Sequence, residues 1–111
     1  MKRPVLKEKV RPIRERDIET AVVMWAKANG ILAVKLSSMS QRSLPDRMFL
    51  LPNGRTVFIE FKVPGNKPTL PQRRMMERIE ELGHEVTWAD NHTQAIAWLD
   101  ERMREQGDKG E

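Results

Sequence analysis

A chain of 111 residues is long enough for one domain with a modest hydrophobic core and too short for two such domains. It contains no cysteine, which excludes disulfides and thiolate metal sites and is typical of a reducing compartment. No apolar stretch approaches the length that spans a membrane, so we expect no membrane partner and a cytoplasmic location.

The formal net charge of +4 is unevenly distributed along the chain. Residues 1–16 hold seven basic and two acidic residues, so this segment carries +5 and the rest of the chain −1. Residues 1–13 show no periodicity and predict a basic flexible arm, whereas residues 105–111 predict a frayed tail. The arm fits an anionic partner such as nucleic acid and fits a solubilising tail equally well. The domain itself is predicted over residues 14–104.

The first helix is predicted from about Arg14 to Asn29. Ile18, Val22 and Trp25 recur at helical spacing, and Asn29-Gly30 supplies a stop signal. Residues 31–36 form an apolar run rich in branched side chains and predict a strand. The polar segment 37–43 that follows predicts a loop long enough to touch a ligand.

A β-hairpin is predicted over residues 44–62. Pro52-Asn53-Gly54 matches a three-residue hairpin loop, because proline presets the first turn position and glycine takes the left-handed position. Counting outward from this loop pairs Asp46 with Glu60, and directly opposed residues share one face of the sheet. Lys62 follows two residues later on the same face. A two-residue loop would instead place Asp46 opposite Phe61.

Two opposed carboxylates repel each other and favour a cation between them. A hard divalent ion such as Mg²⁺ suits this pair, since one or two carboxylates and several waters complete its coordination. The position of Lys62 beside the pair would let this lysine hold or deprotonate one of those waters.

The second half of the chain predicts a helix, a strand and a helix. Thr69 to Gln72 fit a capping box, and the helix that begins there runs to Gly83. Residues 84–89 alternate as a strand, and a last helix starts near residues 90–93. A hairpin followed by a crossover helix and a further strand implies a mixed sheet with helices on its faces.

Several of these residues, taken together, resemble a known family. Pro45-Asp46, then Glu60 and Lys62 on an apolar strand, and a downstream Gln72 are similar in kind and order to the VRR-NUC domains of the PD-(D/E)XK nuclease superfamily. The similarity covers roughly residues 14–100. It implies an α/β fold with a restriction-endonuclease-like αβββαβ core, a mixed sheet flanked by helices, and a C-terminal helix.

The resemblance also implies roles for particular residues. Asp46, Glu60 and the backbone carbonyl of Phe61 would be metal ligands, and Lys62 would position or activate the attacking water. Glu19 matches the acidic residue of the first helix, which can add to the metal site, and Gln72 matches a glutamine that supports the active site. The sequence departs from the family pattern at Ser43-Leu44, where a glycine usually stands two residues before the aspartate.

The implied function is that of a structure-selective DNA endonuclease that uses Mg²⁺ or Mn²⁺, of the kind that resolves Holliday junctions. Such enzymes act as homodimers on branched DNA, here in a bacterial or phage-infected cell. Basic side chains near the site would contact phosphates rather than bases. The candidates for these contacts are Lys35, Arg42, Arg47 and Lys67.

Other interpretations of the same residues remain open. The chain could be a catalytically silent, nuclease-like DNA-binding module in a phage complex, or a restriction-type enzyme that reads a sequence. Gln72 is explained equally well by the capping box, and Glu19 by an ion pair on the helix surface. Lys35 fits an outward-facing strand residue. His84 and His92 lie at element boundaries and are expected at the surface.

Overall fold

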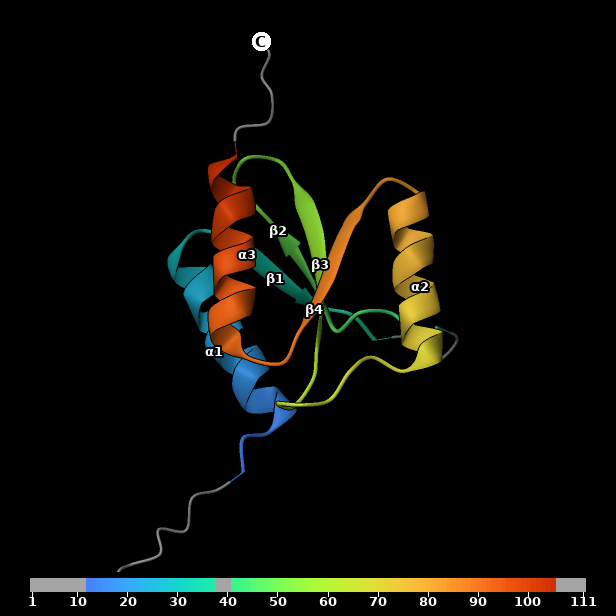
Figure 1. The fold of residues 1–111 in the computed structure, drawn as a ribbon. Coiled ribbons are helices and arrows are strands. Elements are labelled where there is room, and N and C mark those ends of the chain that lie inside the picture. Colours follow the sequence, from blue (N-terminus) through green and yellow to red (C-terminus); the bar gives the residue numbers. More distant parts are fainter. Residues whose placement is uncertain (1–11, 38–40, 106–111) are drawn as a thin grey trace, which may run out of the picture.

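The computed structural model describes residues 12–37 and 41–105. Most of the predicted arm (1–13) and tail (105–111) therefore lies outside the described residues. Within the described ranges the elements follow one another in the order αβββαβα (Figure 1). They are α1 (Glu15–Ala28), β1 (Leu32–Lys35), β2 (Arg47–Leu50), β3 (Thr56–Phe61), α2 (Leu70–Glu81), β4 (Glu85–Ala89) and α3 (His92–Arg104). This order confirms the one predicted from the sequence.

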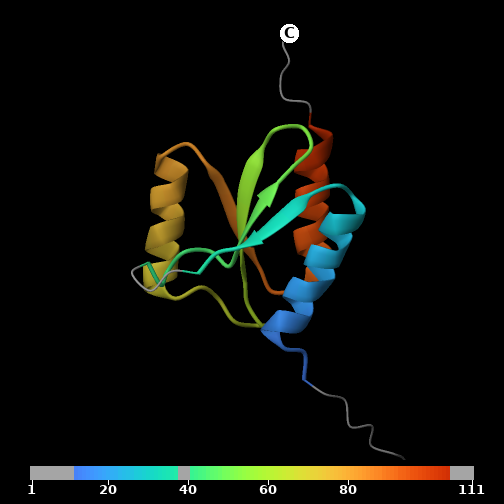
Figure 2. The same cartoon turned by 180° about the vertical axis from the view of Figure 1, so that it is seen from behind.

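The strands form one mixed sheet in the order β1-β2-β3-β4. The β1–β2 and β2–β3 pairs are antiparallel, whereas β3 and β4 are parallel and are joined through the crossover helix α2. Figures 1 and 2 show α1 and α3 against one face of the sheet and α2 against the other. The mixed sheet flanked by helices, with a C-terminal helix, is therefore confirmed.

The hairpin of β2 and β3 has the register that its loop predicts. Met48 pairs with Phe58 and Leu50 with Thr56. The backbone N–H of Leu51 donates to the carbonyl of Arg55 at 2.9 Å, which closes the three-residue loop. Gly54 in that loop has a φ of +88°, a left-handed conformation that strongly favours glycine. The pairing that brings Asp46 beside Glu60 thus follows from local turn chemistry.

The hydrophobic core lies between the sheet and the pair of helices α1 and α3. Helix α1 buries one stripe of apolar residues, which is the stripe that helical spacing predicts. The core consists of Ile18, Val22, Ala26, Ile31, Phe49, Leu51, Val57, Ile59, Phe61, Ala89, Ala95 and Leu99. Helix α2, all of which is described, has no buried residue, and Leu82 just beyond it is 61% exposed. The second face of the sheet is therefore covered less completely than the first.

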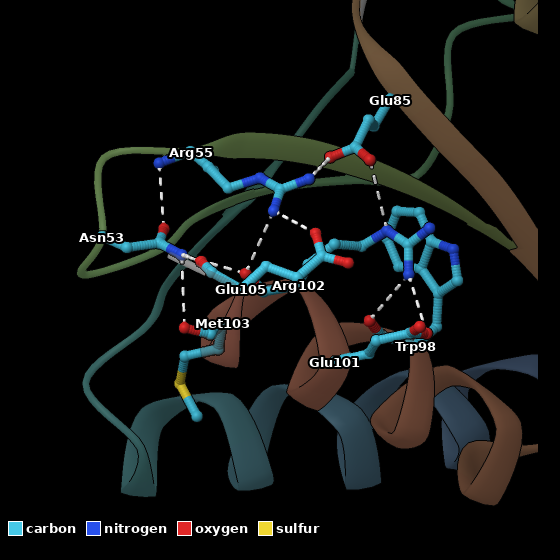
Figure 3. A network of polar contacts seen from close by, with 8 residues as sticks. All are labelled: Asn53, Arg55, Glu85, Trp98, Glu101, Arg102, Met103 and Glu105. Atoms are coloured by element: carbon cyan, nitrogen blue, oxygen red, sulfur yellow. Dashed lines mark hydrogen bonds and ion pairs between the residues drawn. The ribbon is translucent and has the colours of Figure 1, made fainter. Parts of the chain in front are cut away.

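A polar network ties the tip of the hairpin to the end of α3 (Figure 3). The side-chain amide of Asn53 donates to the backbone carbonyls of Arg102, Met103 and Glu105 at 2.9, 3.2 and 3.1 Å. These are carbonyls at a helix C-terminus, where intrahelical partners run out. Arg55 adds ion pairs to Glu85 and Glu105. The network anchors the tip of the hairpin.

Candidate metal centre

Three carboxylates meet at the end of the sheet opposite the hairpin tip. Asp46 directly precedes β2, Glu60 lies one residue before the end of β3, and Glu15 is the first residue of α1. Each offers an oxygen atom, and these three oxygens lie within 4.8 Å of one another. Figure 1 shows that α1 and α2 both begin at this end of the sheet, at the bottom of the view. We call Glu15, Asp46 and Glu60 the acidic cluster.

Glu60 is the most enclosed member of the acidic cluster, with 3% of the residue exposed. Gln72 in the first turn of α2 donates from Nε2 to Glu60 Oε2 at 2.9 Å. The Lys62 ammonium lies 3.5 Å from the same oxygen. Sequence reasoning placed Lys62 and Glu60 on one face, and the structure brings them into contact.

The Gln72 side chain has two hydrogen-bonding partners. Its carbonyl oxygen accepts from the backbone N–H of Thr69 at 2.9 Å, and the backbone N–H of Gln72 donates to the Thr69 hydroxyl at 3.3 Å. This is the capping box that the sequence predicts. The amide nitrogen of the same side chain remains for Glu60. Gln72 can therefore cap α2 and support Glu60 at the same time.

Asp46 is held by the backbone of the neighbouring strand. Its Oδ2 accepts a hydrogen bond from the backbone N–H of Phe61 at 2.7 Å. The Phe61 ring is fully buried in the core, so this part of β3 is firmly placed. Asp46 is thereby oriented with one oxygen bound to the sheet. The role of the Phe61 carbonyl as a ligand stays a prediction.

The acidic cluster is electrostatically unfavourable without a cation. Burial, followed by the charge of Asp46, raises the pKa of Glu60 to about 7, although the nearby Lys62 opposes this rise. Burial is also the largest cause that raises the pKa of Asp46 and that of Glu15. Close carboxylates in a low-dielectric site disfavour one another's charged forms. Three hard oxygen donors in this arrangement fit a divalent ion such as Mg²⁺ or Mn²⁺.

Glu15 is the member of the acidic cluster that sequence reasoning missed. The first helix has two glutamates four residues apart, Glu15 and Glu19, and the second is the one that matches the family pattern. The available signal was this spacing, because residues at i and i+4 lie on the same face of a helix one turn apart. Which of the two reaches the sheet end depends on how α1 lies across the strands.

Glu19 instead contacts two basic side chains from β1 and β2. Its Oε2 lies 2.6 Å from Nε of Arg47 and 3.6 Å from Nζ of Lys35. The side chains of Glu19 and Arg47 are 12% and 19% exposed, whereas that of Lys35 is 64% exposed. Of these two predicted DNA-binding residues, Lys35 is the one that faces solvent.

Two further predicted DNA-binding residues, Arg42 and Lys67, are exposed in loops. Arg42 and Asp46 share the lining of a hollow of about 250 Å³ next to the acidic cluster. The other residues of its lining are Leu36, Ser37, Gln41 and Leu44. Leu44, which stands where the family pattern usually has glycine, is thus part of the lining beside Asp46. His84 and His92 are exposed, as expected.

Within the described ranges, none of the helices is both long and apolar enough to span a membrane.

Comparisons with known proteins identify a sequence relative and a similar solved structure. No family model matches the chain. It is 43% identical over 82 residues to "Putative nuclease p44" of Acyrthosiphon pisum secondary endosymbiont phage 1, a match that covers 74% of this chain and 88% of that protein. A solved structure described as a VRR-NUC domain superposes with a TM-score of 0.71 at 28% identity. That match covers 78% of this chain and 94% of the solved chain.

Proposed function

The chain belongs to the VRR-NUC nuclease family, and from this premise we propose that it is a divalent-metal-dependent DNA endonuclease. A nuclease of this type hydrolyses phosphodiester bonds. The observation that supports metal dependence most directly is the acidic cluster with Lys62 beside it. Three carboxylates within reach of one another are unfavourable in isolation and suit a hard cation.

The proposed ligands are Glu15, Asp46 and Glu60. A bound Mg²⁺ or Mn²⁺ supplies positive charge to the scissile phosphate and acidifies a water molecule. Gln72 and the Phe61 N–H orient Glu60 and Asp46, the kind of outer contact that tunes metal ligands. Hydrolysis would consume one water: its oxygen would bond to phosphorus as the bond to the leaving oxygen breaks, with one proton lost from the water and one gained by the leaving oxygen.

Lys62 is the proposed residue for handling the water. Its ammonium group lies 3.5 Å from Glu60, and its side chain is 14% exposed, so it adjoins the acidic cluster and is partly open to solvent. From there it can donate to the attacking water or to a phosphate oxygen as negative charge develops. Lysine at this position therefore links the carboxylates to the reacting phosphate.

DNA binding is assigned to exposed cations around the same end of the sheet. Lys35, Arg42 and Lys67 face solvent, and phosphate contacts by such side chains position DNA without reading its sequence. We propose that branched DNA, including four-way junctions, is the preferred substrate. Symmetric cleavage of two strands requires two active sites related by a two-fold axis, so the proposal includes a homodimer. Sedimentation equilibrium of the free protein measures this directly, and a monomeric mass at micromolar concentration would contradict it.

The proposed activity is tested with a labelled four-way junction and a linear duplex of matched sequence. Each substrate is incubated with protein plus Mn²⁺, Mg²⁺ or EDTA. We expect paired, symmetric nicks on the junction with either metal and none with EDTA. Glu60→Ala and Lys62→Ala should lower the cleavage rate by about 100-fold or more, because each removes a group proposed to act at the reacting phosphate.

Matched control variants distinguish the loss of a catalytic group from a general effect of removing one charge on the cleavage rate. Lys27→Ala and Glu81→Ala remove one exposed charge each from the ends of α1 and α2, away from the acidic cluster, and should leave the rate unchanged. Equal cleavage of both substrates would support the proposed nuclease activity and contradict the proposed preference for junctions. Binding without cleavage in any metal would reject the enzyme and favour a DNA-binding module.

A further inference from the structure

Two cations oppose each other beside the candidate metal centre. Lys35 on β1 pairs directly with Arg47 on β2, so both side chains lie on the same face of the sheet. Like charges in directly opposed positions are destabilising. The Glu19 carboxylate from α1 compensates both, with one oxygen 2.6 Å from Arg47 and 3.6 Å from Lys35. One carboxylate thus serves two cations.

This trio lies close to the acidic cluster. Arg47 directly follows Asp46 in the chain, and Glu19 lies one helical turn after Glu15 on α1. After the larger effect of burial, the charge of Glu19 raises the pKa of both Glu15 and Asp46, and Lys35 lowers both. The two groups of charges are therefore electrostatically coupled.

An arginine in this position can compete with a metal ion. A guanidinium binds carboxylates through paired hydrogen bonds and stays charged at all accessible pH values. If Glu19 did not hold Arg47, the next carboxylate on the same face of α1 would be Glu15, one turn away. An Arg47–Glu15 pair would occupy a proposed metal ligand.

We propose that Glu19 is a positioning residue that keeps the Arg47 guanidinium paired with itself and so leaves the acidic cluster available to a divalent cation. This inference rests on the proposed metal-dependent function. It gives the first helix two carboxylates with distinct tasks. Glu15 would face the cation, and Glu19, one turn later, restrains the Arg47 guanidinium.

A double-mutant cycle on Mn²⁺ affinity tests this role without any need for cleavage. Isothermal titration of Mn²⁺ is compared in the unsubstituted protein, Glu19→Gln, Arg47→Met and the double variant. Glu19→Gln should weaken Mn²⁺ binding roughly three- to tenfold, which lies at the lower end of the range expected for neighbouring groups that interact. Arg47→Met in addition should restore the affinity to near that of the unsubstituted protein, since the competitor is then absent.

The cycle distinguishes restraint of Arg47 from a simple loss of negative charge. A long-range charge effect of Glu19→Gln would weaken Mn²⁺ binding by the same factor with and without the Arg47→Met substitution, and that result would overturn the proposal while leaving the metal site intact. Absence of Mn²⁺ binding by the unsubstituted protein would overturn both. Glu81→Gln breaks an exposed Arg78–Glu81 pair by the same chemical change and should leave the affinity unaltered.

A second variant covers the case in which Glu19→Gln does not fold. Glu19→Asp keeps the charge and shortens the side chain, so a long-range charge effect predicts unchanged Mn²⁺ affinity. If the shorter side chain holds Arg47 less well, Mn²⁺ affinity should fall in part, and Arg47→Met should again restore it. Unchanged affinity in this variant would contradict the proposal. Cooperative thermal unfolding of each variant in EDTA establishes that the protein measured is folded.

Discussion

Glu60 experiences burial, repulsion from a carboxylate and attraction to a cation at the candidate metal centre. It lies on a core strand with 3% of its surface exposed, yet it faces a second carboxylate and contacts only one cation, Lys62, among the described ion pairs. Burial and the charge of Asp46 raise its pKa to about 7. A carboxyl group in these surroundings keeps its proton to a higher pH than an exposed glutamate does, and a bound cation would favour its charged form.

The raised pKa of Glu60 predicts a stability that depends on pH in the metal-free protein. In the unfolded chain the glutamate loses its proton near the ordinary glutamate pKa of 4.5, whereas in the folded chain it keeps the proton to about 7. The folded state therefore binds more protons between these values, and the free energy of unfolding falls as pH rises through that window. The fall attributable to Glu60 should reach at most about 3 kcal/mol.

Urea unfolding in EDTA at pH 5 and pH 8 measures this effect. Glu60→Gln should show a clearly smaller fall than the unsubstituted protein, with a residual slope of the same sign because the pKa values of Asp46 and Glu15 are also raised. Glu81→Gln, with a side chain in solvent, serves as the control. Equal falls in the unsubstituted protein and Glu60→Gln would show that Glu60 does not carry this proton.

At the scale of elements, α2 depends on its first turn more than on its packing. All of its residues are described and none is fully buried, so the helix is not anchored by deep core side chains. Its N-terminus is instead secured by the Thr69–Gln72 capping box and by the bond from Gln72 to Glu60. The same turn thus begins the helix and supports a proposed metal ligand.

Thr69 and Gln72 allow these two tasks to be separated. Thr69→Ala removes the N-cap side chain and should cost about 0.5–2 kcal/mol of unfolding free energy. Gln72→Ala removes the reciprocal bond of the capping box and should also lower the unfolding free energy. Gln72→Ala alone also removes the hydrogen bond to Glu60. It should therefore weaken Mn²⁺ binding by about 10- to 100-fold, the usual effect of losing a contact that orients a ligand.

Unfolding and calorimetric titration of the two variants provide the comparison. Thr69→Ala should lose stability but keep Mn²⁺ affinity close to that of the unsubstituted protein. Similar affinities in the two variants would assign Gln72 to the cap and remove its role in supporting Glu60.

At the scale of the whole molecule, the two ends of the sheet serve different purposes. The hairpin tip is bound to the C-terminus of α3 by Asn53 and Arg55 (Figure 3), whereas the opposite end gathers the acidic cluster. The network that anchors the hairpin tip is thus separated from the charges proposed for catalysis. Repulsion within the acidic cluster remains a cost to folding unless a cation is bound.

A bound divalent cation should therefore stabilise the folded protein. Ligands that bind only the folded state raise the unfolding free energy by mass action, by about 2.7 kcal/mol at a concentration 100 times the dissociation constant. For a domain of this size we expect Mn²⁺ to raise the melting temperature by roughly 10 °C or more at that excess. Differential scanning calorimetry in Mn²⁺ and in EDTA measures the shift. Glu60→Gln should shift far less, and an equal shift in that variant would place the cation elsewhere.

The amino-acid sequence by itself determined the features that rest on neighbouring residues. The Pro52-Asn53-Gly54 loop predicts the hairpin register that the structure confirms, and this register brings Asp46 beside Glu60. The cap of α2 follows from the spacing of Thr69 and Gln72 in the same way. The family resemblance and the order of elements were also accessible from these motifs.

Only the tertiary structure decided which residues complete the acidic cluster and how deeply it is buried. Glu15 and Glu19 are equivalent in helical periodicity, and the way α1 lies across the sheet assigns the first to the cluster and the second to Arg47 and Lys35. The raised pKa of Glu60 likewise results from burial by elements distant in sequence. Local rules describe neighbours along the chain, whereas burial and charge pairing depend on which surfaces the packed helices and strands bring together.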